Sequence, residues 1–329
     1  MSDLGLGQID ERLASELASE LDDVEVLLRD SLESDFPFVT SASRHLVDAG
    51  GKRFRPLLVL LAAQFGDPTA PGVVPSAAVV ELTHLATLYH DDVMDEAQLR
   101  RGAPSANARW DNTIAILTGD FLFARASDLL ADLGPEAVRI QAQTFARLVV
   151  GQIKETLGPG PDDDPVEHYL SVIADKTGSL IATSGRFGAL MSGASREVVD
   201  VMTEFGELIG VAFQLADDVL DVSSESADSG KTPGTDLREG VHTLPVLHAL
   251  RSDNAEDAEL QSLLGDDLAD DGRHSRALEL LRSSAAMARS RADLERHADA
   301  ARKALVPLPS GPAKDALESL CDVVISRVG

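Results

Sequence analysis

The segment VVPSAAVVELTHLATLYHDDVMD, residues 73–95, predicts a long apolar helix. It is strongly apolar over its first eighteen residues and then ends in three aspartates. Apolar residues at helical spacing recur elsewhere, for example between Leu13 and Leu28, and no segment shows the alternation of a β-strand. The sequence therefore predicts an all-α fold of about ten or more helices.

Glycine and proline clusters separate these helical stretches. They include Gly50-Gly51, GDPTAPG from Gly66 and GPGPDDDP from Gly158, where Asp164 is expected to cap a helix that begins at Pro165. No flexible linker divides the chain into halves. We expect one domain over 1–329, with a motif-bearing core at about 44–250 and an acidic connection and C-terminal helices at 251–329.

Composition excludes several classes of protein. The 329 residues include 29 Lys and Arg against 55 Asp and Glu, and this net charge of −26 argues against binding nucleic acid through phosphates. The single cysteine, Cys321, excludes a disulfide scaffold and a multi-cysteine zinc site. The chain shows neither a bilayer-spanning apolar run nor a basic, apolar signal peptide at its start. A cytoplasmic protein without stable membrane insertion is expected.

Two acidic clusters share one pattern: DDVMD at 91–95 and DDVLD at 217–221. On a helix the first and last aspartate of each cluster lie on one face, where like charges repel. Mg²⁺ suits such sites, because it binds one or two carboxylates together with substrate phosphates. A chain this acidic could show the pattern by chance on a solvated face, but both clusters follow strongly apolar segments.

Lysine and arginine are scarce in this chain, so places where they cluster in the sequence are candidate binding sites. Arginine forks and lysine ammonium groups near Mg²⁺-binding carboxylates indicate a polyanionic ligand such as diphosphate. The alternative for each is an ordinary surface ion pair. The candidates are Lys52, Arg53, Arg55, Arg100, Arg101, Lys176 and Lys231.

Together these residues resemble the trans-polyprenyl diphosphate synthases, the polyprenyl synthetase family, from about residue 44 to residue 250. The order and spacing of the matching motifs are highly specific. The motifs are GGKRFRP (50–56), HDDVMDEAQLRRG (90–102), LTGDFLFARA (117–126), GQIKE (151–155), KTGSL (176–180), FQLADDVLD (213–221) and GKTPGTDLREG (230–240).

The resemblance implies an antiparallel helical bundle around a deep central cavity, usually as a homodimer. It implies a prenyltransferase in which a cluster of Mg²⁺ ions bridges the aspartates to an allylic diphosphate, farnesyl or geranylgeranyl. In the implied reaction the diphosphate leaves to give an allylic carbocation, the double bond of isopentenyl diphosphate attacks this cation, and loss of a proton completes the product. This chemistry needs charge neutralisation and a dry cavity rather than a protein nucleophile.

The resemblance also assigns residues. Isopentenyl diphosphate is expected at Lys52, Arg55, His84 and Arg101, and the allylic diphosphate at Arg100, Lys176, Thr177, Gln214 and Lys231. The first-choice metal ligands are Asp91, Asp95 and Asp217, followed by Asp92, Asp218 and Asp221. The chain departs from many relatives at Val241, where they have lysine; His242 is a candidate substitute. It also has only Arg327 near its end, where some relatives have a basic tail.

Product length is expected to depend on Ala86 and Thr87, one turn before Asp91. Short-chain relatives often have bulky aromatics there, so this small pair predicts a long product. The stretch HLATLYHDDVMDE (84–96) resembles long-chain actinobacterial synthases of quinone side chains, which implies about seven to ten isoprene units, for menaquinone. Tyr89 lies elsewhere on the helix. A geranylgeranyl product is the alternative if a residue such as Phe145 plugs the cavity from a facing helix.

Two rival classes remain for comparison. A class I terpene cyclase should lack GGKRFRP and usually replaces the second acidic cluster. A non-catalytic subunit that tunes product length in a heteromeric synthase usually loses one cluster, whereas both clusters are whole here.

Overall fold

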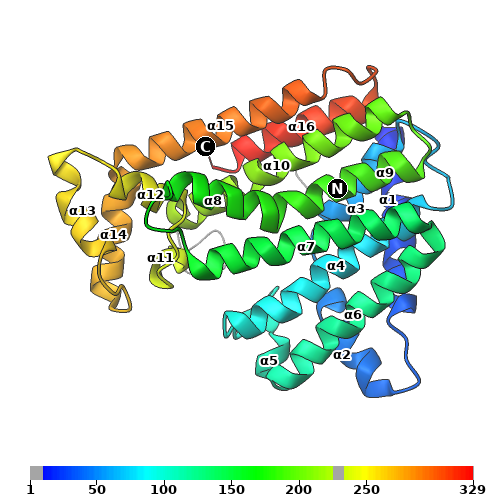
Figure 1. Ribbon diagram of the computed structural model, residues 1–329, viewed down its shortest axis with the longest axis horizontal. Helices are drawn as coiled ribbons and strands as arrows, with labels where there is room; N and C mark the ends of the chain where they lie inside the picture. Colours follow the sequence, from blue (N-terminus) through cyan, green and yellow to red (C-terminus); the bar gives the residue numbers. More distant parts are fainter. Residues whose placement is uncertain (1–9, 225–232, 329) are drawn as a thin grey trace. The chain divides into compact units, whose positions relative to one another are not determined.

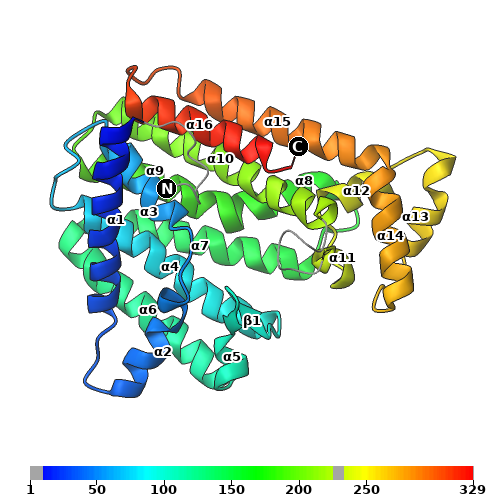
Figure 2. The ribbon, with the colours of Figure 1, turned by 180° about the vertical axis from the view of Figure 1, so that it is seen from behind.

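The structure is a computed structural model that describes residues 10–224 and 233–328. Within these ranges its regular elements are helices and one short β-hairpin (Figures 1 and 2). The all-α prediction is confirmed. None of the described helices combines the length and apolar character needed to cross a membrane.

The contacts of the chain form two compact units. The first comprises the chain up to Ala146 together with Leu180–Gly206 and Pro307–Ser319. The second comprises Arg147–Ser179, Glu207–Val306 and the chain from Leu320. Four of the five divisions fall inside helices α7, α9, α10 and α16, and the fifth lies in the connection between α15 and α16. The prediction of a single domain stays a prediction.

The first unit begins with α1 and continues through the hairpin to α6. Its elements are α1 (Glu11–Ser31), α2 (Pro37–Asp48), α3 (Phe54–Ala63), α4 (Val73–Met94), β1 (Leu99–Arg100), β2 (Ala103–Pro104), α5 (Ala106–Arg109) and α6 (Asn112–Leu133), with most of α9 (Ser179–Met191).

Apolar helices that approach closely form the core of this unit. Every residue of α3 from Pro56 to Ala63 is buried, and α4 packs beside both α3 and α6 (Figure 1). A Cβ atom on Gly188 of α9 would lie 2.0 Å from the carbonyl oxygen of Val59, so glycine permits α9 to touch α3. Each fully buried leucine of α3 contributes about 1.5–3 kcal/mol at most.

The second unit holds most of the later helices. Its elements are α8 (Pro165–Ile173), the π-helical turn η2 (Ala174–Gly178), α11 (Thr235–Arg238), α12 (Leu244–Leu250), the 3₁₀ turn η3 (Ala255–Asp257), α13 (Ala258–Leu264), α14 (Asp271–Ser283) and α15 (Ala285–Ala304). Three long helices belong to both units: α7 (Pro135–Leu157), α10 (Arg196–Ser223) and α16 (Pro312–Ser326).

Local sequence explains where α8 begins. Asp164 caps α8 as predicted, because its Oδ1 accepts the N–H groups of Val166 at 2.9 Å and Glu167 at 3.2 Å. In the same unit α12 packs against α15, and α13 lies beside α14 (Figure 2). The short helix α11 lies between α10 and α12 along the chain.

Candidate functional site

The loop between α2 and α3, Gly50–Arg53, has an unusual backbone. Gly50 and Gly51 have φ angles of 85° and 145°, and Arg53 has a φ of 49°, in the left-handed region that side-chain-bearing residues rarely adopt. A Cβ atom on Gly51 would lie 2.8 Å from Cζ of Arg101. Glycine therefore lets this guanidinium group rest against the basic loop.

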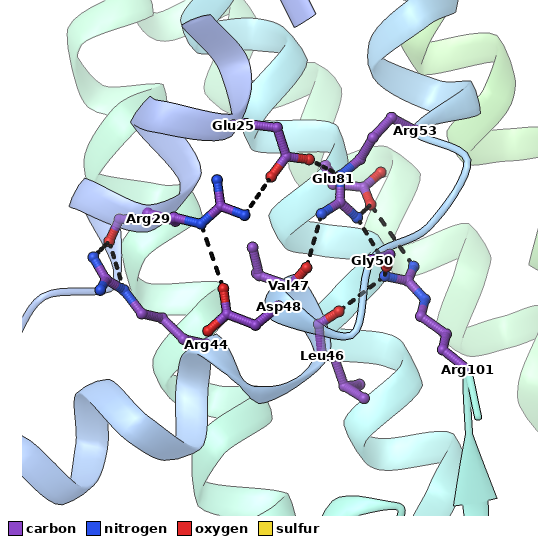
Figure 3. A network of polar contacts seen from close by, with 10 residues as sticks. All are labelled: Glu25, Arg29, Arg44, Leu46, Val47, Asp48, Gly50, Arg53, Glu81 and Arg101. Atoms are coloured by element: carbon purple, nitrogen blue, oxygen red, sulfur yellow. Dashed lines mark hydrogen bonds and ion pairs between the residues drawn. The ribbon is translucent and has the colours of Figure 1, made fainter. Parts of the chain in front are cut away.

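Arg53 is the centre of a buried ion-pair network (Figure 3). Its Nε donates to Glu25 of α1, and its Nη1 donates to Oε1 of Glu81 of α4 at 3.0 Å. The carbonyl oxygens of Gly50 and Val47 accept further bonds at 3.3 Å and 3.1 Å. Burial opposes its charge, but the two carboxylates prevail and raise the pKa of Arg53. Arg53 thus fastens the loop to both α1 and α4.

Three predicted diphosphate-binding side chains gather beside Glu81. Nη2 of Arg101 lies 3.8 Å from Oε1 of Glu81. Burial lowers the pKa of Arg55 to about 10; Glu81 opposes this effect and Arg101 adds to it. Burial also holds the pKa of His84 well below its ordinary value, helped by Arg55 and Arg101, so His84 is neutral at pH 7. Nε of Arg55 is buried without a hydrogen-bond partner among the described residues.

The β1–β2 hairpin presents the two neighbouring arginines to different partners. Its turn residues, Arg101 and Gly102, both have positive φ angles, 55° and 75°, as a two-residue hairpin turn requires. Nε of Arg100 donates to Oδ1 of Asp92 at 2.6 Å. Nη1 of Arg101 donates instead to the carbonyl oxygen of Leu46 at 3.0 Å. The fourth predicted member of the isopentenyl set, Lys52, is exposed on the basic loop.

The first acidic cluster closes α4. The helix ends at Met94, and the N–H of Asp95 donates to the carbonyl oxygen of Asp91 at 2.8 Å. Carboxylates there lie at the negative end of the helix dipole, which disfavours their charge unless a cation is near. Arg100 pairs with one oxygen of Asp92, and the other, Oδ2, is buried without a hydrogen-bond partner in the described part of the chain. Burial raises the pKa of Asp92 against the pull of Arg100.

The second acidic cluster occupies the last turns of α10. Nη2 of Arg327, near the C-terminus, lies 2.8 Å from Oδ1 of Asp217. The carboxylate of Asp221 accepts the backbone N–H groups of Thr235 at 3.2 Å and Asp236 at 3.3 Å, which begin α11. Asp221 therefore also has a structural task.

A chain of hydrogen bonds joins Asp218 to the KTG motif. Tyr169 of α8 donates to Oδ2 of Asp218, and Nε2 of Gln214 donates to Oδ1 at 2.9 Å. Thr177 in turn donates to Oε1 of Gln214 at 3.2 Å. Burial, the largest effect, raises the pKa of Asp218 to about 7, although both hydrogen bonds oppose it. Two predicted allylic-site residues are thus connected to the second cluster.

Lys176 and Thr177 lie in the π-helical turn η2, a kind of irregularity that is frequent at functional sites. A Cβ atom on Gly151 of α7 would lie 2.8 Å from the backbone nitrogen of Lys176, so glycine allows α7 to approach η2. Nζ of Lys176 pairs with Oε2 of Glu155 at 2.6 Å. Lys231, predicted to bind the same diphosphate, lies outside the described residues.

The predicted product-length pair lies where α4 meets α6. Ala86 is fully buried, and a Cβ atom on Gly119 of α6 would lie 3.1 Å from its carbonyl oxygen. The Thr87 hydroxyl donates to the carbonyl oxygen of His84 at 2.8 Å. Tyr89 is buried by α2, where its hydroxyl donates to the carbonyl oxygen of Ala42 at 2.6 Å.

Two further contacts lie near this pair on α4. Nε2 of Gln141 of α7 donates to the hydroxyl of Thr83 at 2.6 Å, and both side chains are buried. The ring of Phe145 lies 4.4 Å from that of Phe123, which is 5.8 Å from His90. An aromatic group, which sequence alone could not place, therefore flanks α4 one turn from Ala86.

The donors of both acidic clusters are carboxylate oxygens, the class that Mg²⁺ and Ca²⁺ prefer. The buried, unpartnered oxygen of Asp92 and the two helix C-termini suit a bound cation. Within residues 10–224 and 233–328, no three His, Cys, Asp or Glu side chains are grouped as a metal site.

Sequence reasoning missed three side chains that hold this machinery. Glu81 is the lone acidic residue in VVPSAAVVELTH, and this isolation in an apolar helix was an available signal. Tyr169 is one of only two tyrosines. Glu25 carries no local signal, because it lies in a helix rich in acidic residues.

Comparisons with known proteins show the family of this chain. Residues 37–281 match the family model described as polyprenyl synthetase. A nonaprenyl diphosphate synthase of Mycobacterium tuberculosis is 52% identical over 307 residues, which cover 93% of this chain and 92% of that protein.

Solved structures of related proteins match this chain over nearly its whole length. The crystal structure of a geranylgeranyl pyrophosphate synthase from Corynebacterium glutamicum, complexed with calcium and isoprenyl diphosphate, matches with a TM-score of 0.89 and 47% identity, covering 98% of this chain and 99% of that one. A decaprenyl diphosphate synthase from Rhodobacter capsulatus matches with a TM-score of 0.88 and 37% identity, covering 97% and 99%. This chain therefore belongs to the polyprenyl synthetase family.

Proposed function

We propose that this protein joins isopentenyl diphosphate to an allylic diphosphate, farnesyl or geranylgeranyl, and repeats the reaction to give an all-trans product of about C35–C50. The protein is a prenyltransferase, as its family and its relatives are. The long product agrees with the names of the nonaprenyl and decaprenyl relatives. Menaquinone side chains are the proposed use of the product, and the cytoplasm is the proposed location.

The observation that carries this proposal is the cationic group around Glu81. Arg53, Arg55 and Arg101 share this carboxylate, and Nε of Arg55 has no protein partner in the described chain. A buried excess of positive charge is costly without an anion. In a chain with a net charge of −26 such a group has a specific purpose, and a diphosphate supplies the missing charge.

Each of these side chains has a distinct task in the proposed isopentenyl site. Arg55 and Arg101 bind phosphate oxygens through their planar forks, and Lys52 adds a point charge from the exposed loop. His84 is neutral, so it donates one hydrogen bond without adding repulsion to the arginines. These contacts orient the double bond of the substrate and hold it for attack.

Mg²⁺ is the proposed metal. The first cluster would hold it through Asp91, Asp95 and Asp92, and the second through Asp217, Asp218 and Asp221. When bound, the metal neutralises the charge that develops on the leaving diphosphate. Arg100, Lys176, Thr177, Gln214 and Lys231 are the proposed contacts of the allylic diphosphate. The calcium in the Corynebacterium structure supports a divalent cation in this family.

The long product is supported by the small side chains of Ala86 and Thr87. A shorter, geranylgeranyl product is the second candidate, and a specific contact favours it. Phe145 packs on Phe123, which lies beside His90, one turn from Ala86 on α4. The Corynebacterium relative is named for that shorter product.

A homodimer is the proposed assembly. Exposed apolar side chains support it: on α6 Ile116 is 44% and Leu117 is 58% exposed, and on α7 Val150 and Ile153 are 46% and 51% exposed. Such residues are typical of helices that pack against another subunit. Analytical ultracentrifugation of the protein and of Leu117→Glu tests this assembly, because the charge should disrupt the dimer.

Product analysis tests the proposal directly. The purified protein is incubated with Mg²⁺, labelled isopentenyl diphosphate and farnesyl diphosphate, and the products are separated by length. Products longer than C20 are expected. A stop at C20 would replace the long-chain assignment by the geranylgeranyl one. No product, although both diphosphates bind, would identify a non-catalytic subunit.

A further inference from the structure

The loop Gly50–Arg53 is held in a strained conformation at the side of the proposed isopentenyl site. The φ of 49° at Arg53 puts a residue with a Cβ in the left-handed region, which is unfavourable and persists only when surrounding contacts enforce it. The loop carries Lys52 and leads directly into Arg55. Its conformation therefore decides where two of the proposed phosphate contacts lie.

The side chain of Arg53 supplies the enforcing contacts (Figure 3). Its guanidinium group is held by two carboxylates, Glu25 and Glu81, and by the carbonyl oxygens of Val47 and Gly50. The side chain is 8% exposed, so these bonds are shielded from water. The contacts join the last turn of α2 to the loop that follows it.

The same contacts reach a third phosphate-binding candidate. Arg101 donates to the carbonyl oxygens of Gly50 and Leu46, and it shares Glu81 with Arg53. Arg53 and Arg101 therefore have a common carboxylate and a common backbone acceptor. A shift of Arg53 would move the loop and Arg101 together.

Glu25 connects the ion-pair network of Arg53 to α1. It lies on α1, before the family match begins at residue 37, and its second oxygen is 3.3 Å from Nη2 of Arg29. Because Glu25 occupies Nε of Arg53, the carboxylate of Glu81 stays shared between Arg53 and Arg101. Without the charge of Glu25, Arg53 would draw Glu81 away from Arg101.

We propose that Glu25, acting through Arg53, is a positioning residue for the isopentenyl diphosphate site, so that α1 is part of the substrate-binding machinery. This inference rests on the proposed function of that site. It concerns one substrate only, because Arg53 bonds to the loop, α1, α2 and α4, which carry the proposed isopentenyl contacts Lys52 and His84.

The test is the variant Glu25→Gln, which keeps the shape and removes the charge. We expect the KM for isopentenyl diphosphate to rise about tenfold, the typical effect of weakening one charged hydrogen bond, while the KM for farnesyl diphosphate and kcat stay within about twofold. Glu25→Asp should restore part of the affinity. The matched control is Glu16→Gln, which removes an exposed ion pair with Arg12 on the same helix.

Each other result overturns the inference. If Glu25→Gln only lowers the unfolding temperature, its role is structural. If the KM values of both substrates rise equally, Glu25 does not act on one site. The contacts of Arg53 to Glu81, Val47 and Gly50 remain in the variant, so folding is expected. A wild-type protein that makes no prenyl product would refute the proposed function as well, whereas normal kinetics of Glu25→Gln in an active enzyme would refute only this inference.

Discussion

The two acidic clusters differ in one residue, DDVMD at 91–95 against DDVLD at 217–221, yet their surroundings differ greatly. The first cluster forms the last turn of α4, and Arg100 pairs with its second aspartate, Asp92. The second cluster is engaged by α8, α11 and the C-terminal residues. Equal motifs therefore do not imply equal environments.

The second aspartates of the two clusters, Asp92 and Asp218, have partners of different charge. Arg100 brings a full positive charge to Asp92, whereas Tyr169 and Gln214 bring only neutral donors to Asp218. Burial raises the pKa of Asp218 to about 7, because the two neutral donors oppose this effect without neutralising the carboxylate. The second cluster thus combines a proposed metal site with the structural support of its neighbours.

The largest expected effect separates these two duties. Asp91→Asn removes a proposed metal ligand at the end of α4, and turnover should fall about 10²–10³-fold. Asp221→Asn should lower turnover too, but it also weakens the cap of α11 and should cost about 1–2 kcal/mol of stability. Steady-state kinetics and thermal melts measure both. If Asp221→Asn is as stable as the wild type, the carboxylate of Asp221 does not stabilise the start of α11, and the two clusters do not differ in structural role.

The next largest expected effect is on product length, and it compares the helical turns that precede the two clusters in α4 and α10. Ala86 lies five residues before Asp91, and Ala212 lies five residues before Asp217; both are fully buried. Ala86→Phe should shorten the product markedly, because the small side chains of Ala86 and Thr87 are proposed to let the growing chain pass α4. Ala212→Phe should leave product length unchanged and lower stability by about 1–3 kcal/mol through overpacking. Product chromatography decides, and an unchanged length in Ala86→Phe would refute the role of this pair.

The helical fold and both clusters could be predicted because they depend on local patterns. Apolar spacing marks α4 and α10, and the cap at Asp164 follows from residues within one turn. The partners of the clusters could not be predicted, since Arg327 is 110 residues from Asp217 and Tyr169 is 49 residues from Asp218. The left-handed backbone conformation of Arg53 could not be predicted either, because the contacts that enforce it come from residues distant in sequence.

A smaller effect uses pH to test the neutral donors of the second cluster. The folded pKa of Asp218, about 7, exceeds its ordinary value of 3.8, so the folded protein keeps a proton that the unfolded chain loses between these values. The stabilisation that protonated Asp218 gives the folded state is complete below pH 3.8 and disappears as the pH rises through about 7. In metal-free buffer, Asp218→Asn should therefore gain stability relative to the wild type, by at most about 1.4 kcal/mol per pH unit between pH 5 and pH 7. A pH-independent difference in urea unfolding would show that Asp218 ionises normally.

The smallest effect concerns the cation of the second cluster. Arg327 pairs with Asp217, whose side chain is 40% exposed, and its guanidinium lies 4.8 Å from the ring centre of Phe213. Such a pair contributes about 0–1 kcal/mol, so a metal can displace it, and Arg327→Ala should lower the Mg²⁺ concentration for half-maximal activity by no more than about fivefold. Arg302→Ala, which removes a surface pair with Asp322, is the control. A rise in the Mg²⁺ requirement would contradict competition, because Arg327 would then assist the bound diphosphate, and the two clusters would both depend on an arginine.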